Sequence, residues 1–256
     1  MLNLEMKERS EASLKREGLS LTEVKRYREA LDLLGPYAGR LEGPVLDFGA
    51  SYGLSLLALA TLGVEDVWGV EPDQGRVERG AKVLASSGMK GSRITHVADT
   101  RNLPFPDDHF GSVLALAVFE HIPQPRCDYL RELWRVLRPG GRLLIAETPN
   151  KYFPVDVHTT GLPLIPWLPE KVAHAIGRRW GRNRDWYSTR DKWRGSGWRG
   201  MGYYEMAGAI PGKFACEHID CRPRHGRLRR MGLFPGLLDP YPIYAIRKEG
   251  AEVEVS

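Results

Sequence analysis

The sequence lacks long apolar runs, internal repeats and the cysteines that a disulfide framework needs. Its longest uninterrupted apolar run, residues 113–119, is far shorter than the ~20 residues of a membrane-spanning helix. The first residues are charged throughout and have no apolar segment typical of a secretory signal. The three cysteines, Cys127, Cys216 and Cys221, favour a reducing compartment. We therefore expect a cytoplasmic protein.

Length and composition indicate one large folded domain with room for an appended lobe. The chain has 256 residues, is 42% hydrophobic and carries a net charge of +5, which suits a globular protein with a full core. The charge is uneven. Residues 178–200 hold eight Lys or Arg against two Asp, and residues 222–230 hold five Arg and no acid. The rest of the chain is net acidic, so a basic surface belongs to the C-terminal part.

The first forty residues have a polar, helical pattern. Ser20 and Glu23 stand at the spacing of a capping box, and apolar residues follow at helical spacing as far as Gly35 and Pro36, where we expect the helix to end. We interpret residues 1–40 as an amphipathic helical cover packed outside a sheet.

Residues 41–150 alternate short apolar strands with helices. Strands are predicted at 45–48, 67–71, 94–97, 113–119 and 142–147, and helices at 54–62, 74–85 and 130–137. The sequence Pro-Gly-Gly at 139–141 predicts a turn. This alternation implies right-handed crossovers and a parallel, doubly wound sheet, with the fourth strand central because it is apolar throughout.

The regular alternation then ends. Residues 151–212 are rich in Pro, Gly, Trp and Arg and are predicted to form an inserted substrate lid with a short helix at 171–179. Residues 213–256 are predicted to complete the sheet, with strands at 213–219 and 241–246 joined by a helix around 224–231. The predicted fold class is α/β: a doubly wound, mostly parallel seven-stranded Rossmann-like sheet with an N-terminal helical cover and an inserted lid.

The segment VLDFGASYG, residues 45–53, joins an apolar strand to a helix through a turn that contains glycine. Gly49 and Gly53 allow a tight turn and close approach of a ligand to the backbone, and the start of the next helix presents unpaired N–H groups. Glu71 ends the next strand, where a carboxylate can accept hydrogen bonds from two ribose hydroxyls. An adenosine-containing ligand is one interpretation, and an ordinary sheet turn beside a surface acid is the other.

A set of segments extends this pattern along the chain: VLDFGASYG at 45–53, GVEPD at 69–73, ADTRNLPFPDDHFGSV at 98–113, AVFEHI at 117–122 and LRELWRVLRPGGRLLIAETPN at 130–150. Together they resemble class I S-adenosylmethionine-dependent methyltransferases, and most of all the group that includes the ubiquinone and menaquinone methyltransferases. The resemblance covers about residues 45–150 and implies S-adenosylmethionine as the cofactor. A nicotinamide dehydrogenase fits less well, because its turn has a different pattern of three glycines.

The resemblance also implies a role for individual residues. The methionine part of the cofactor would lie among Asp47, Gly49, Ala50, Ser51, Gly53 and Ala117. The ribose hydroxyls would bind Glu71, and the adenine would lie against Pro72, Asp99 and Thr100. Ser51 departs from the family pattern, which usually has a glycine there, so we expect the turn to differ at this point.

Methyl transfer from a sulfonium needs little chemical help, because the methyl group is already activated. The protein aligns the acceptor, excludes water and, for a hydroxyl acceptor, takes up a proton. His121 follows the fourth strand, at the edge where doubly wound sheets bind ligands, and an imidazole suits proton uptake near neutral pH. His158 is the second candidate base, with Asp156 and Tyr152 as neighbours. For each of these residues the alternative is a structural role in a loop.

Other patterns have ordinary structural explanations. A zinc site at Cys216, His218 and Cys221 would need a fourth suitable ligand, and the chain has no second cysteine pair, so we expect no metal. Residues 161–169 are apolar and either cover the active site or rest on a membrane surface. In residues 178–200, arginines are interleaved with Trp180, Trp186, Trp193 and Trp198. These arginines either bind an anionic or sugar-bearing ligand or belong to a loop that the tryptophans anchor.

The predicted function is methyl transfer from S-adenosylmethionine to a small or medium acceptor that is anionic, sugar-bearing or lipid-linked, with oxygen favoured as the acceptor atom. A nucleic-acid (RNA) methyltransferase is the first alternative, because basic segments can follow a phosphate backbone. The sequence AVFEHIP after the fourth strand argues against it, since nucleic-acid members of the family generally carry a different catalytic tetrad there. The second alternative is a non-catalytic module that uses the cofactor fold for binding. Peripheral membrane contact and the oligomeric state stay open.

Overall fold

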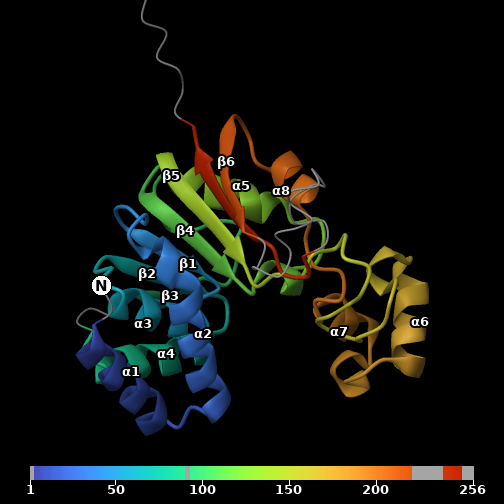
Figure 1. The fold of residues 1–256 in the computed structure, drawn as a ribbon, viewed down its shortest axis with the longest axis horizontal. Coiled ribbons are helices and arrows are strands. Elements are labelled where there is room, and N and C mark those ends of the chain that lie inside the picture. The colour runs from blue at the N-terminus through green and yellow to red at the C-terminus, as the bar shows by residue number, and fades with distance from the viewer. Residues whose placement is uncertain (1–2, 90–92, 221–238, 250–256) are drawn as a thin grey trace, which may run out of the picture. The chain divides into compact units, whose positions relative to one another are not determined.

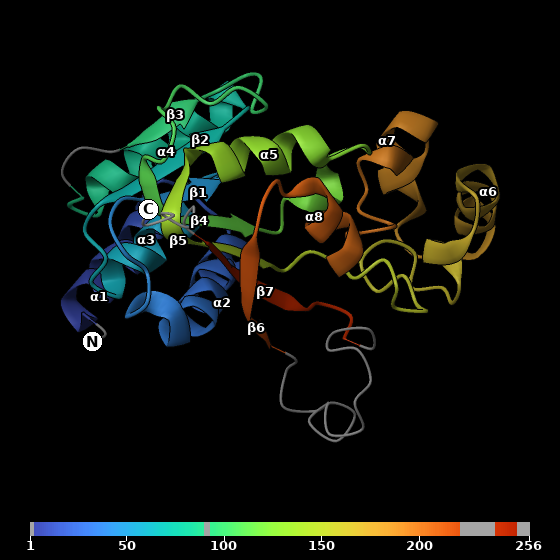
Figure 2. The same ribbon diagram turned by 90° about the horizontal axis from the view of Figure 1, so that it is seen from above.

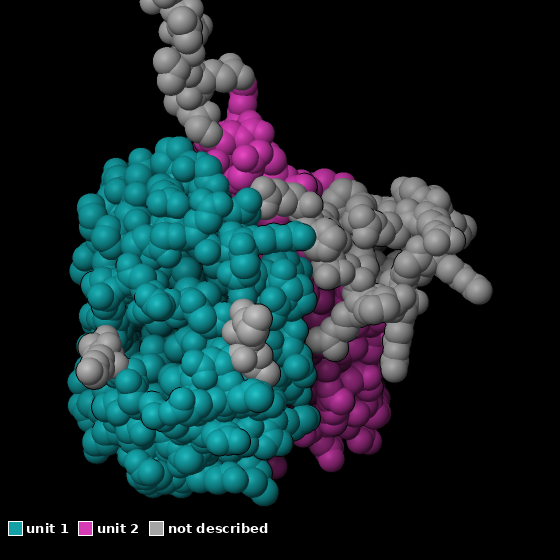
Figure 3. Space-filling model, turned by 60° about the vertical axis from the view of Figure 1, so that its left-hand side comes forward, with its two compact units in different colours: residues 1–114, 135–142, 250–256 teal, residues 115–134, 143–249 magenta. Residues whose placement is uncertain are grey.

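The computed structural model describes residues 3–89, 93–220 and 239–249. The chain divides into two compact units, which are coloured separately in Figure 3. Within the described chain, the first unit holds residues up to 114 together with 135–142, and the second holds residues 115–134 and those from 143 onward. The two units are described in turn.

The strands form a seven-stranded sheet in the order β3-β2-β1-β4-β5-β7-β6 (Figure 1). Strand β1 pairs in parallel with β2 and β4, β2 pairs in parallel with β3, and β6 is antiparallel to β7. The predicted fold class, a mostly parallel doubly wound sheet, is therefore confirmed. The strands span Val45–Phe48 (β1), Val67–Glu71 (β2), Ile94–His96 (β3), Phe110–Leu116 (β4), Leu137–Ala146 (β5), Phe214–Asp220 (β6) and Ile243–Lys248 (β7).

Four helices belong to the first unit: Leu4–Arg16 (α1), Leu21–Ala38 (α2), Leu54–Thr61 (α3) and Gln74–Ser86 (α4). Buried polar contacts join them. The hydroxyl groups of Tyr27 on α2 and Thr61 on α3 lie 2.8 Å apart, and the Ser13 hydroxyl on α1 donates to the carbonyl of Val83 on α4 at 2.6 Å. The first two helices are thus fixed to the helices that follow β1 and β2.

Helix α2 begins as predicted and ends later than predicted. Its capping box is present, with Glu23 accepting from the Ser20 backbone N–H. The expected end at Gly35 and Pro36 is wrong, because the helix continues through Pro36 to Ala38. Proline in the last turn removes one helical hydrogen bond, while Tyr37 beside it is buried. Burial of that side chain favours the extra turn.

Strands β4 and β5 also differ from their predicted bounds. Strand β4 begins at Phe110 and ends at Leu116, earlier than predicted at both ends. Strand β5 includes Gly140 and Gly141, which were predicted as part of a turn. A Cβ atom on Gly141 would lie 2.8 Å from the Gly111 carbonyl oxygen. Gly141 therefore permits a close approach of two strand backbones, whereas Gly140 keeps a left-handed φ of 80° within the strand.

The second unit contains more regular structure than the predicted lid. Its elements are Phe119–His121 (η1), Ile165–Trp167 (η2), Glu170–Trp180 (α6), Arg184–Tyr187 (η3), Arg190–Arg194 (α7) and Tyr203–Ala209 (α8), while Cys127–Val136 (α5) runs from this unit into the first. Helices α6 and α7 lie side by side in both ribbon views (Figures 1 and 2), joined by an ion pair between Arg194 and Glu170. The short helix predicted at 171–179 is confirmed, and the helix predicted around 224–231 lies outside the described residues.

The segment around α6 has an apolar core of its own, built from Ile165, Ala173, Tyr187, Trp193 and Trp198. The rings of Trp193 and Trp198 are stacked with centroids 4.9 Å apart. Trp180 and Trp186, in contrast, are exposed. The four tryptophans of the basic segment, residues 178–200, therefore divide into two that fill a core and two that lie on the surface.

Among the described helices, none has the length and apolar character needed to cross a bilayer.

Substitution of Gly111 tests the close backbone contact at the start of β4. In Gly111→Ala the new Cβ would lie 1.9 Å from the Glu42 carbonyl oxygen, so part of the backbone must shift. We expect a loss of about 1–3 kcal/mol in the free energy of unfolding, measured by urea denaturation followed by circular dichroism.

The control is Gly35→Ala within α2, where a Cβ would meet nothing within 4 Å. Alanine at that helical position should raise stability by about 0.5–1 kcal/mol. Equal stability of the two variants would show that the contact at Gly111 is absent.

Candidate active site

The turn between β1 and α3 is tight and depends on left-handed backbone conformations. Gly49, Ser51 and Gly53 have φ angles of 83°, 49° and 75°. The N–H groups of Gly49 and Ala50 both donate to the Val70 carbonyl, at 2.9 and 3.0 Å. Ser51 therefore occupies a left-handed conformation that favours glycine, and the expected difference of the turn from the family pattern stays a prediction.

Small residues allow this turn to approach β2. A Cβ atom on Gly69 would lie 2.7 Å from the Cβ of Ala50, a separation that real side chains do not tolerate. On the other side, a Cβ on Gly80 of α4 would lie 3.1 Å from the Tyr52 backbone. The turn is thus enclosed by β2 and α4, and its backbone shape leaves little room to change.

Glu71 holds the turn in place. Its carboxylate is buried, and its two oxygens accept from different backbone N–H groups: Oε2 from Ser51 at 3.0 Å and Oε1 from Asp73 at 3.1 Å. The side chain thereby links the turn after β1 to the turn after β2. A carboxylate has about four acceptor positions, so acceptor capacity is left for ligand hydroxyls.

Asp47 is a second buried acid near this turn. The Ser55 hydroxyl donates to its Oδ2 atom, yet burial raises the pKa of Asp47 from 3.8 to about 7, with the Ser55 contact lowering it in part and the charge of Glu71 raising it further. Asp47 and Glu71 are therefore two neighbouring acids with one side-chain hydroxyl, that of Ser55, bound to Asp47. A cationic ligand group near them would be stabilised.

Asp99, in contrast, is exposed and already paired. Its two oxygens accept from the Arg101 guanidinium at 2.8 and 3.0 Å, and these contacts lower the pKa of Asp99 to about 2. Its neighbour Thr100 is buried, and Pro72 is exposed. The sequence singled out Asp99 without its arginine partner.

The second unit brings the two candidate bases together. The rings of His121 and His158 lie 5.7 Å apart between centroids, and the carboxylate of Glu120 lies beside them, with its Oε1 atom 3.8 Å from Nε2 of His121. Burial raises the pKa of Glu120, opposed by the neighbouring His121. The sequence predicted both histidines as separate candidates and gave Glu120 no role, although Glu120 lies within the AVFEHI segment.

The chain leading to these residues is held by backbone contacts. Ala117 is exposed, has a φ of 53°, and donates its N–H to the Ala146 carbonyl at 3.0 Å. Asp156 accepts from the backbone N–H groups of His158, Thr159 and Thr160. Asp156 therefore fixes the loop backbone that carries His158.

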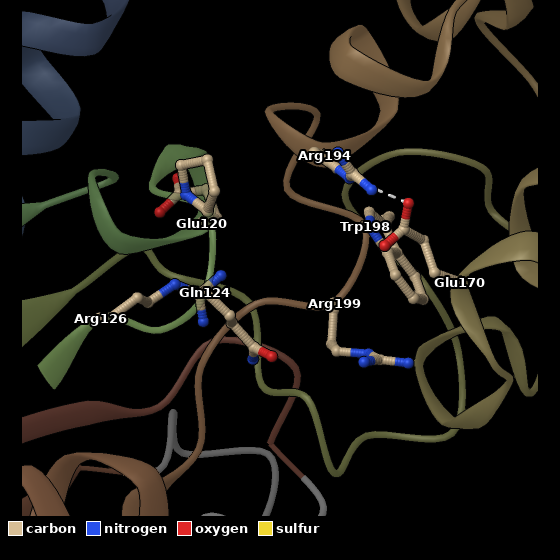
Figure 4. A pocket seen from close by; sticks show the side chains of 8 residues that line it. Glu120, Gln124, Arg126, Glu170, Arg194, Trp198 and Arg199 are labelled. Atoms are coloured by element: carbon tan, nitrogen blue, oxygen red, sulfur yellow. Dashed lines mark hydrogen bonds and ion pairs between the residues drawn. The ribbon is translucent and has the colours of Figure 1, made fainter.

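A pocket in the second unit lies next to Glu120 and contains several cationic side chains (Figure 4). Arg126 donates to the Gly200 carbonyl at 2.5 Å and pairs with Glu205 at 3.1 Å. Arg199 lies over the ring of Trp198, 4.3 Å from its centroid. The lining residues are Glu120, Pro123, Gln124, Arg126, Glu170, Arg194, Trp198 and Arg199.

Comparison with known proteins gives a family match for the middle of the chain. Residues 46–145 match the family described as a methyltransferase domain. This segment is a methyltransferase domain. The match confirms the resemblance to class I methyltransferases that the motifs predicted for residues 45–150.

The relatives cover part of the chain. A 27-O-demethylrifamycin SV methyltransferase of Amycolatopsis mediterranei is 33% identical over 103 residues, 40% of this chain and 38% of that protein. A demethylmenaquinone methyltransferase of Clavibacter sepedonicus is 37% identical over 115 residues, 44% of this chain and 43% of that protein. The chain thus spans about two fifths of the length of these relatives.

Solved structures support the fold of the methyltransferase domain and its flanking elements. A S-adenosylmethionine-dependent methyltransferase of Mesorhizobium loti aligns over 86% of this chain and 96% of its own, with a TM-score of 0.54 and 18% identity. At this identity the alignment supports the fold alone.

The methyltransferase domain implies S-adenosylmethionine as its cofactor, and residues of the first unit fit that molecule. Its ammonium group would supply the positive charge that the buried Asp47 carboxyl lacks. Its ribose hydroxyls would find acceptor positions on Glu71, which two backbone N–H groups already orient.

Replacement of Asp47 tests its raised pKa. The folded protein keeps the Asp47 proton up to about pH 7, whereas an unfolded aspartate loses it near pH 3.8. Stability contributed by this proton is full below pH 3.8 and is lost as pH rises through about 7. Between pH 4 and pH 8, the free energy of unfolding of Asp47→Asn should therefore rise by roughly 2–4 kcal/mol relative to that of the wild type.

Urea denaturation at one-unit pH intervals measures this difference. The exposed Asp32 on α2 supplies the control variant Asp32→Asn, whose stability should follow the wild-type pH profile. Parallel profiles for Asp47→Asn and the wild type would contradict the raised pKa.

Proposed function

We propose that this chain transfers a methyl group from S-adenosylmethionine to a hydroxyl oxygen of a small or medium anionic acceptor. The observation that carries the proposal is the Glu71 carboxylate, which is buried between the turns after β1 and β2 and oriented by the backbone N–H groups of Ser51 and Asp73. An acid held in this way binds vicinal hydroxyls with a charge-assisted pair of hydrogen bonds.

In this proposal the first unit binds the cofactor. Asp47 pairs with the ammonium group, the turn backbone from Gly49 to Gly53 lies along the methionine chain, and Glu71 accepts from the ribose hydroxyls. The adenine lies against Pro72, Asp99 and Thr100, with Arg101 neutralising Asp99. Ala117, which follows directly on β4, borders the methyl-bearing end.

The second unit provides the acceptor side. When bound, the sulfonium cofactor supplies an activated methyl group, so the chain's residues need only orient the acceptor and remove its hydroxyl proton. His121 and His158, with rings 5.7 Å apart, are the proposed proton-accepting pair. Residues 151–212 act as the lid that excludes water from them, as the division of the sequence predicted.

The arginines next to Glu120 favour an anionic acceptor. Arg126, Arg194 and Arg199 line the same pocket as Glu120. Arg126 also pairs with Glu205, and Arg194 pairs with Glu170. Guanidinium groups bind carboxylate or phosphate through paired hydrogen bonds, so a carboxylated or phosphorylated compound matches this lining.

The internal contacts of the basic segment weigh against an RNA substrate. Arg178 and Arg182 donate to the carbonyls of Arg184 and Val157, and Arg194 pairs with Glu170. These contacts use three of the eight basic side chains of residues 178–200 within the fold of the segment, which disfavours a continuous track for a phosphate backbone. Residues 222–230 lie outside the described residues. The cytoplasmic location expected from the sequence stays a prediction.

Calorimetric titration with S-adenosylhomocysteine tests the cofactor site. Glu71→Gln removes the charge from the ribose contact while keeping the size of the side chain. We expect affinity to fall roughly 10- to 150-fold, from a loss of about 1.5–3 kcal/mol.

The matched control is Glu78→Gln, which changes an exposed carboxylate on α4 and should bind the ligand as the wild type does. Absence of binding to the wild type at high protein concentration would remove the proposed function. An unchanged affinity in Glu71→Gln would remove the ribose assignment alone.

A further inference from the structure

Three possible metal ligands converge in the second unit. Glu120 and His121 belong to η1, and His158 lies in the loop that follows β5. One ligand atom from each residue lies within 4.8 Å of the others. The sequence offered the two histidines as bases and gave no reason to group them with Glu120.

The buried carboxylate of Glu120 is incompletely satisfied. Its Oε2 atom accepts from the Thr148 hydroxyl at 2.9 Å. Its Oε1 atom is buried and has no hydrogen-bond partner among the described residues. An unsatisfied buried acceptor costs about 1–3 kcal/mol, and more when it is charged, so a bound positive group at Oε1 would stabilise this side chain.

The hydrogen bonding of His121 points its lone pair toward that same oxygen. The Nδ1 atom lies 2.9 Å from the Gly195 carbonyl oxygen, which can only accept, so Nδ1 carries the proton and Nε2 is the acceptor in the neutral ring. Nε2 in turn lies 3.8 Å from Oε1 of Glu120. Two acceptors facing each other across this distance are stabilised by a cation between them.

The arrangement around the histidines resembles the support of a metal site. Ligand imidazoles in such sites usually place their second nitrogen against a protein group, which fixes the tautomer and the ring orientation. His121 meets this condition through Gly195, and Nδ1 of His158 lies 3.4 Å from the Tyr241 hydroxyl.

We propose that Glu120, His121 and His158 bind a divalent transition-metal ion of the zinc class. Two imidazoles and one carboxylate are the donor set of open, catalytic zinc sites, whereas magnesium and calcium prefer oxygen ligands alone. Ligand atoms around one tetrahedral zinc ion lie roughly 3.3–3.5 Å apart. The widest pair, which lies within 4.8 Å, must therefore close by roughly 1.4 Å when the ion binds.

The metal would change how the acceptor loses its proton, and this part rests on the proposed function. A hydroxyl bound at the open position of the metal has a lowered pKa and gives its proton to water. The two histidines then act as ligands and the metal-bound oxygen is the nucleophile. Metal binding itself does not depend on methyl transfer.

Spectroscopic titration of the whole chain tests the site. Protein freed of metal with a chelator is titrated with Co²⁺, which gives visible absorption bands when nitrogen and oxygen ligands surround it, and Zn²⁺ is then added as a competitor. We expect one equivalent of Co²⁺ to bind and to be displaced by Zn²⁺. Glu120→Gln, His121→Ala and His158→Ala should each weaken Zn²⁺ binding about 100-fold or more.

The control variant is His174→Ala, which removes another histidine of the same unit and should bind Zn²⁺ as the wild type does. Circular dichroism of each variant establishes that it is folded, and Glu120→Gln keeps the size of the buried side chain. Failure of the wild type to bind Co²⁺ and Zn²⁺ would overturn the proposal. Equal binding by all three ligand variants would assign the ion to other side chains and would overturn it as well.

Titration of the chelator-treated protein with S-adenosylhomocysteine separates the two proposals. Zinc binding that depends on the three residues, without binding of S-adenosylhomocysteine, would support the metal site and remove the proposed function. Binding of S-adenosylhomocysteine without zinc binding would support the function and remove the metal site.

Discussion

The structure depends on one buried carboxylate that ties together the ends of two parallel strands. Glu71 accepts from backbone N–H groups in the turns after both β1 and β2. A buried charge is costly unless hydrogen bonds satisfy it, so these contacts are the condition for placing an acid there. They also fix Ser51 in a left-handed conformation. The shape of the turn and the position of the Glu71 carboxylate therefore depend on each other.

A second acid so close to the first gives the site a preference for positive charge. Asp47 lies in the interior near Glu71, and burial together with that neighbouring charge raises its pKa. With no cation at hand, Asp47 holds a proton near neutral pH. A ligand ammonium group would replace that proton and restore the charge. Binding of a cationic ligand and ionisation of Asp47 are thereby coupled.

Local sequence predicted the elements whose signals are local. The strand from Val45 to Phe48 is an unbroken apolar run, and the capping box at Ser20 is set by two residues three apart. The start of β5 was wrong because Gly141 acts through a contact with the backbone of Gly111 in β4. A glycine that permits close approach is indistinguishable in sequence from one that makes a turn.

The candidate site shows the same division. Asp47, Gly49 and Gly53 are close together in sequence and carry a family pattern, so the sequence could propose them as part of a cofactor site. Glu120 was missed because its importance comes from burial and from Thr148 and His158, which are distant along the chain. Arg101, the partner of Asp99, was missed although it is only two residues away, because arginine beside aspartate is common on surfaces.

The part of the chain that matches the family explains why residues for the methyl donor are easier to propose than residues for the methyl acceptor. The match to the methyltransferase family ends at residue 145, whereas His158, Arg194 and Trp198 all lie beyond it. Within the match, the proposed cofactor site consists of a backbone turn and two acids that belong to the segments carrying the resemblance. The pocket next to Glu120 is lined in part by side chains that the match does not cover. The identity of the acceptor must therefore be read from the chemistry of this chain's own side chains, and among these the incompletely satisfied Glu120 is the most specific.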